Sequence, residues 1–152
     1  MTTSEDHVAL VADLVEAVRI RVLDPLSILL GPAASVDALA ERLSYEAEMW
    51  AAQLLDGTDA VAWQRLSTLL AALHPADEFD PPVRWWQTPL GRLVARRFGY
   101  PGREHVSFPV AGAMLGVTRQ GVFDLVNRGK LTRHAGGGVS TDSVRDRLRG
   151  TR

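Results

Sequence analysis

Cysteine is absent from the 152-residue sequence, so disulfide bonds, thiolate metal sites and cysteine nucleophiles are all excluded. Long apolar runs are also missing. The uncharged stretch at residues 25–36 is broken by Gly31 and Pro32, and it is shorter than the about 20 apolar residues that a membrane-spanning helix needs. Residues 1–7 are polar and acidic, unlike a secretion signal. We therefore expect a cytoplasmic protein with no membrane partner.

Lysine is scarce: it occurs once, as Lys130, and arginine supplies every other basic residue. Together with abundant alanine, this usage indicates a GC-rich bacterial genome. The net charge of −1 hides a separation of charge along the chain. Residues 1–87 contain five basic and fourteen acidic residues, whereas residues 88–152 contain twelve basic and four acidic ones. Two interpretations explain this asymmetry equally well. Either a basic module that faces nucleic acid is joined to an acidic module, or both charged stretches are simply solvated surfaces.

Apolar residues recur at three- and four-residue steps through the acidic part and predict three helices. The first is expected over residues 4–24 with a stripe of valines, the second over 35–57, and the third over 58–74. Residues 75–82 are acidic and proline-rich, which interrupts helix and marks the domain boundary. We predict an acidic helical bundle at residues 1–80, which dimerises or binds a partner or signal.

The basic domain is predicted over residues 88–152, and its informative part lies between Val106 and Leu148. Ser107 is expected to begin a short helix that Gly116 ends, and Thr118 is expected to cap the next helix. Val117, between them, should face the core. Two helices joined by a glycine-containing turn predict a helix-turn-helix, whose second helix enters the major groove of DNA.

The first turn of this second helix carries Arg119 and Gln120, which are suited to bidentate hydrogen bonds with guanine and adenine. Phe123 lies one turn further along, where it either touches a thymine methyl group or, about twice as often for such a residue, packs in the core. Gly121 is expected to weaken the helix by about 1 kcal/mol relative to alanine.

Beyond the helix, residues 131–133 and Val139 predict two strands of a hairpin whose tip is the glycine-rich segment 134–138. Basic side chains on this hairpin would contact phosphates without reading sequence. The complete set of predicted DNA-contacting residues is Ser107, Thr118, Arg119, Gln120, Phe123, Asn127, Arg128, Lys130, Arg133 and His134.

Residues 115–131 read LGVTRQGVFDLVNRGKL and are followed by a glycine-rich segment and a final amphipathic stretch. This pattern resembles the excisionase-like branch of the MerR-type winged helix-turn-helix superfamily. The resemblance implies double-stranded DNA binding, as a homodimer or as adjacent copies, in transcription or recombination. It implies a recognition helix at residues 118–128 and a wing at 131–139. The expected fold is therefore mainly α, with an N-terminal helical bundle followed by a winged helix-turn-helix with a small β-hairpin.

Enzyme signals are weak in this sequence. The four histidines are scattered without the i, i+4 spacing of a helical metal site, and Gly129-Lys130 lacks the other residues of a phosphate-binding loop. We therefore expect no catalytic activity, cofactor or metal. The leading hypothesis is a nucleoid-associated bacterial transcriptional regulator that is sequence-specific and homodimeric. The alternatives are an architectural or excisionase-like recombination factor, and an antitoxin or adaptor whose N-terminal helices bind a protein partner.

Overall fold

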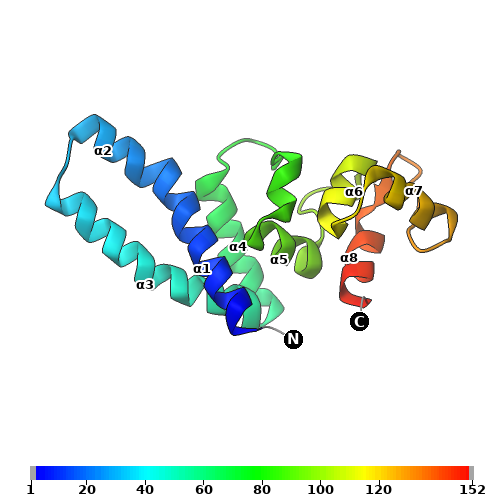
Figure 1. Cartoon of the computed structure of the whole chain (residues 1–152), viewed down its shortest axis with the longest axis horizontal. Coiled ribbons are helices and arrows are strands. Elements are labelled where there is room, and N and C mark those ends of the chain that lie inside the picture. The colour runs from blue at the N-terminus through cyan, green and yellow to red at the C-terminus, as the bar shows by residue number, and fades with distance from the viewer. Residues whose placement is uncertain (1–2, 151–152) are drawn as a thin grey trace. The chain divides into compact units, whose positions relative to one another are not determined.

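The computed structural model describes residues 3–150, and internal contacts separate the chain into two units, Met1–Ala76 (unit 1) and Asp77–Arg152 (unit 2). The architecture is mainly helical, with one two-stranded antiparallel sheet, which confirms the mainly α class (Figure 1). No helix in the described part of the chain has both the length and the apolar character to cross a membrane.

The described residues of unit 1 form helices that are joined by short connections. They are α1 (Ser4–Val18), the π-helix η1 (Arg19–Leu23), α2 (Asp24–Leu30), α3 (Ala34–Asp56) and α4 (Asp59–Leu73). Helix α1 packs along α3, and α3 packs along α4. The buried side chains that join these three helices include Leu14 from α1, Leu54 from α3 and Leu66 from α4. The apolar periodicity of the sequence therefore produces the expected helices.

The first helical segment differs from its prediction in length and in its buried face. Pro25 was expected to end it, but η1 carries the chain into α2, where Pro25 occupies the first turn. Proline has no N–H and crowds the carbonyl four residues earlier, and a wider π turn relieves this conflict. The fully buried side chains are leucines, such as Leu10, whereas in the expected valine stripe Val8 is 65% exposed and Val15 and Val18 are only partly buried.

Unit 2 has shorter elements. They are the 3-10 helix η2 (Val83–Gln87), α5 (Pro89–Phe98), β1 (His105–Val106), α6 (Phe108–Leu115), α7 (Arg119–Asn127), β2 (Val139–Ser140) and α8 (Thr141–Gly150). Trp86 is fully buried, with the rings of Tyr100 at 4.9 Å and Trp85 at 5.0 Å between centroids. Phe79 adds a third aromatic contact. The segment 77–87 therefore anchors to unit 2 through Trp86 and the aromatic rings around it.

The sheet of unit 2 differs from the predicted hairpin. Val139 pairs with Val106 of β1, a strand that the sequence analysis did not anticipate. On its other side Val139 meets Arg133 only through an isolated bridge. Residues 131–133 therefore do not form a regular strand, although Ser140 N–H donates to the Thr132 carbonyl at 2.8 Å and closes the loop.

Candidate nucleic-acid interface

Helices α6 and α7 pack against each other through a short turn. Ser107 caps α6, and its Oγ accepts a hydrogen bond from Val110 N–H at 3.4 Å. Gly116 ends the helix in the left-handed conformation, with φ +72°, which glycine adopts without steric cost. A Cβ on Gly112 would lie 2.7 Å from the Val117 carbonyl oxygen, so α6 needs glycine where the turn crosses it.

Val117 was predicted to turn into the core, but it is 40% exposed. Its backbone is held by the hydrogen bond from Val117 N–H to the Gly112 carbonyl at 2.9 Å, and the buried position belongs to Val122 one turn into α7. The side chain of Val117 lies against Gly121, whose Cβ would be 3.3 Å from the Val117 Cβ. This close approach gives a structural reason for glycine in the first turn of α7.

The first turn of α7 is exposed. Thr118 caps the helix by accepting a hydrogen bond from Gly121 N–H at 3.0 Å. Arg119 and Gln120 follow it with exposed side chains, and Gln120 Nε2 donates to Asp124 Oδ1 at 3.2 Å along the helix. Because a single exposed hydrogen bond of this kind is weak, Gln120 can exchange it for another acceptor or donor at little cost.

Phe123 is not a core residue, although core packing was the preferred interpretation of the sequence. It is 42% exposed, and its ring lies 6.3 Å from the ring of Phe108 at the start of α6. The Arg133 guanidinium lies 5.5 Å above the same Phe108 ring. The cation–π contact positions an exposed arginine beside α7, so residues from three segments converge here.

The end of α7 presents further polar side chains. Asn127 is its last residue, and Arg128 is the C-cap, whose N–H donates to the Asp124 carbonyl at 3.0 Å. Lys130 N–H folds back to the Leu125 carbonyl at 2.8 Å. The side chains of Asn127, Arg128 and Lys130 are all exposed. These backbone hydrogen bonds fix the positions from which the three side chains extend, and their polar ends lie in solvent.

His134 lies at the base of the glycine-rich loop and is joined to β1. Its ring stacks on His105, with centroids 4.5 Å apart, and its Nδ1 accepts a hydrogen bond from Gly136 N–H at 2.9 Å. Its Nε2 is 3.9 Å from a Glu104 carboxylate oxygen. The sequence placed these histidines in separate segments, and only the pairing of β1 with β2 brings them together.

Three arginines that the sequence analysis did not select line a hollow of about 900 Å³ next to the α6–α7 turn. Arg92 and Arg96 come from α5, Arg147 comes from α8, and Thr118 also lines the hollow. The i, i+4 spacing of Arg92 and Arg96 places both on one face of α5, and this spacing was the available sequence signal. Neither of them forms an ion pair with a carboxylate among residues 3–150.

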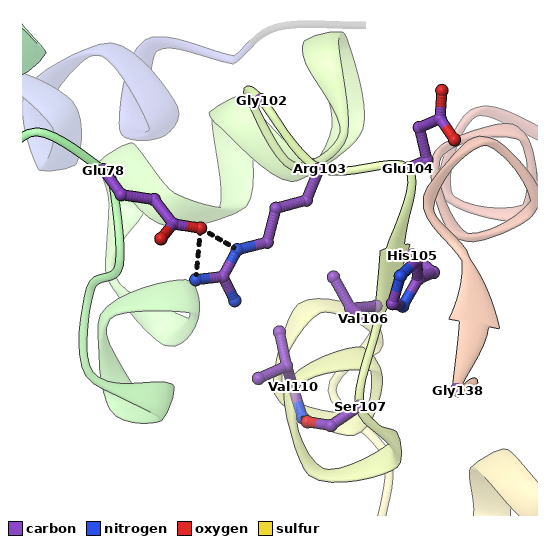
Figure 2. Close-up of a pocket in the computed structure, with 9 residues that line it drawn as sticks. All are labelled: Glu78, Gly102, Arg103, Glu104, His105, Val106, Ser107, Val110 and Gly138. Atoms are coloured by element: carbon purple, nitrogen blue, oxygen red, sulfur yellow. Dashed lines mark hydrogen bonds and ion pairs between the residues drawn. The ribbon is translucent and has the colours of Figure 1, made fainter. Parts of the chain in front are cut away.

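A second hollow, beside β1, has a different electrostatic character. Figure 2 shows Arg103 reaching across it to Glu78, with 3.1 Å between Arg103 Nη2 and Glu78 Oε1. Arg103 also lies 3.4 Å from the Asp80 carboxylate, and Glu104 projects away from the pair into solvent (Figure 2). Ser107 lies on the rim of this hollow. Its acidic lining disfavours phosphate, so the arginine-lined hollow is the better anion site.

The buried hydroxyl of Tyr100 in unit 2 has a structural role. Burial raises the pKa of Tyr100 to about 12, and its hydroxyl donates to the Phe79 carbonyl at 3.1 Å. No group of three or more histidine, aspartate or glutamate side chains in the described residues is arranged to hold a metal ion.

Compared with known proteins, the chain matches no protein-family model, no curated protein and no solved structure.

Proposed function

We propose that unit 2 is a winged helix-turn-helix domain of the excisionase-like type, and that the protein is a sequence-specific, double-stranded DNA-binding regulator of bacterial transcription. The observation that carries this proposal is the convergence on α7: its first turn exposes Arg119 and Gln120, and Arg133 is held beside it over Phe108. An exposed, well-capped helix with these side chains suits the major groove.

In this proposal Arg119 and Gln120 read base edges, because both side chains form the bidentate hydrogen bonds that distinguish guanine and adenine. Phe123 contacts a thymine methyl group, in line with its exposure. The predicted contacts from Arg128, Lys130 and Arg133 are to phosphates, which fix the register of the helix without reading sequence. The arginine-lined hollow adds a second phosphate contact on the other side of the α6–α7 turn.

The proposed regulator acts as a homodimer. One small DNA-binding module buries only about 600–1,000 Å² on DNA, and two modules bound to two half-sites provide the specificity that a promoter requires. Unit 1 supplies the contact between copies, because its described residues include large apolar side chains that its own packing leaves exposed, such as Ile28.

Fluorescence anisotropy with duplexes selected from random DNA tests the proposal. Arg119→Ala should weaken binding to the selected duplex by roughly 5- to 150-fold, equivalent to about 1–3 kcal/mol, and relax the preference at one base pair. Arg133→Ala should instead weaken selected and random duplexes alike and reduce the salt dependence by about one phosphate contact. Arg84→Ala, which changes an exposed arginine of η2 that lines neither hollow, is the matched control and should leave both quantities unchanged.

A protein adaptor is the second candidate, and the exposed apolar side chains of unit 1 favour it. It predicts that the wild-type chain has no salt-dependent affinity for any duplex at roughly 50 mM salt, where non-specific binding is strong. That result would overturn the DNA-binding proposal. Equal effects of Arg119→Ala on selected and random duplexes would leave DNA binding standing and remove the base-reading role of Arg119.

A further inference from the structure

The helices of unit 1 are not packed against their neighbours along their whole length. Helices α1, η1 and α2 run antiparallel to α3 and form a long helical hairpin with it. Helix α4 covers only the part of α3 that lies next to the α3–α4 connection (Figure 1). The far end of the hairpin, residues 19–42, is called here the hairpin tip. Two helices alone can bury only the seam between them, where Leu23, Val36 and Leu43 meet.

The hairpin tip exposes large apolar side chains to an unusual degree. Helix α2 has no buried residue at all. The exposed fractions are 53% for Ile20, 43% for Val22, 82% for Ile28, 79% for Leu29, 71% for Leu30 and 50% for Leu39. Single exposed apolar residues are ordinary on a protein surface, but a cluster of this kind marks an interaction site.

The charges around the tip indicate which partner fits. Unit 1 has four basic and eleven acidic residues, yet the tip contains three of each and is neutral. Two of its three arginines form ion pairs within the unit: Arg19 Nη1 lies 2.7 Å from Asp24, and Arg42 Nη2 lies 3.2 Å from Glu46. Outside the tip, two acidic units would repel each other. The tip is therefore the part of unit 1 where two copies can meet without like-charge repulsion.

We propose that the hairpin tip binds the hairpin tip of a second copy of this chain. The two hairpins pack their exposed apolar faces together, with α2 at the centre, and form a four-helix arrangement about a two-fold axis. A tip with no net charge offers little to a strongly charged partner, which favours self-association. This dimer deepens the proposed function, which calls for two copies, but it can be tested without DNA.

The test is sedimentation velocity of the full chain at micromolar concentrations. The wild type should sediment as a dimer, and Ile28→Glu/Leu30→Glu should raise the dissociation constant by at least about 100-fold, because four apolar side chains per dimer are replaced by carboxylates. The matched control is Val8→Glu/Val61→Glu, which adds the same charge at exposed apolar positions of unit 1 outside the tip, 65% and 40% exposed. It should remain dimeric.

Circular dichroism establishes that each variant is folded. A pair of variants with opposite charges at residue 28 provides a second, independent test of the interface. Ile28→Lys and Ile28→Glu chains should each be monomeric alone and should form a heterodimer when mixed. A monomeric wild type, or a dimer that survives Ile28→Glu/Leu30→Glu, would overturn the proposal. Failure of DNA binding in the anisotropy assay, with the dimer still present by sedimentation, would remove the proposed function and leave the dimer in place.

Discussion

Unit 1 carries four basic and eleven acidic residues, whereas unit 2 carries thirteen basic and seven acidic residues. What each unit leaves on its surface also differs. Unit 1 exposes aliphatic side chains at the hairpin tip, while unit 2 exposes arginines around α7 and along α5. An apolar, neutral surface suits association with protein, and a basic surface suits a polyanion. The two units therefore differ in the chemistry of the partner that each surface would suit.

The two units also hold themselves together differently. Unit 1 relies on side chains of long helices, whose leucines fill the spaces between α1, α3 and α4. Unit 2 has short elements that approach each other closely through backbone contacts. A Cβ on Gly91 would lie 2.1 Å from the Trp85 carbonyl oxygen, and one on Gly138 would lie 2.0 Å from the Val106 carbonyl oxygen. Among the described residues of unit 1, Gly57 makes a comparable contact, since its Cβ would lie 2.4 Å from the Gln53 carbonyl oxygen. Alanine at Gly91 or Gly138 should therefore destabilise unit 2 and leave the packing of unit 1 unaffected.

The largest expected effect comes from Gly91→Ala. The added methyl group collides with backbone, which cannot rotate away as a side chain would, so the free energy of unfolding of unit 2 should fall by about 3 kcal/mol. Hydrogen–deuterium exchange followed by mass spectrometry measures the change separately in each unit. Gly150→Ala, where a Cβ meets nothing within 4 Å, is the control. Equal destabilisation of both units by Gly91→Ala would show that the added methyl group does not act through the local contact with Trp85.

The next effect concerns the basic surface. Arg92→Gln/Arg96→Gln should lower the slope of log affinity against log salt by about 1.8 and weaken DNA binding roughly 50-fold near 0.1 M salt, if each arginine neutralises one phosphate. Anisotropy titrations at several salt concentrations measure this slope. The control Arg65→Gln/Arg84→Gln removes the same charge from positions outside both the hollow and the hairpin tip. Identical slopes for the two double variants would mean that the hollow has no special contact with DNA.

The smallest effect is a difference in alkaline stability. The pKa of Tyr100 is raised from 10.0 to about 12 in the folded state, so above pH 10 the unfolded chain loses this proton first. The stabilisation is complete below about pH 10 and is lost as the pH rises, by about 1.4 kcal/mol near pH 11. Tyr100→Phe should abolish this slope.

Urea unfolding monitored by fluorine NMR of 5-fluorotryptophan resolves the transition of Trp86, beside Tyr100, from that of the tryptophans in unit 1. The wild-type transition of Trp86 should move to lower urea between about pH 9 and pH 11 relative to Tyr100→Phe. The same shift in both proteins would mean that another group is responsible.

Some features of the α6–α7 region could be predicted because they depend on neighbours in the chain. Thr118 caps α7 and Gly116 takes positive φ, and both requirements are visible in a few consecutive residues. Strand β1 could not be predicted, since two residues carry no periodicity and their partner lies in β2. The exposure of Phe123 was also missed, because the choice between core and surface depends on what else fills the core.

From the sequence alone, the three main helices of unit 1 and the two helices of the α6–α7 region could be predicted, as could the separation of charge along the chain and the identity of the side chains in the first turn of α7. Only the tertiary structure decided that α2 continues past Pro25 with no buried residue, and that Arg133 lies over Phe108. Only the tertiary structure also decided that Arg92, Arg96 and Arg147 share one hollow. The physical reason is range: capping, helix periodicity and charge act among neighbouring residues, whereas burial and convergence depend on segments that the chain brings together from far apart.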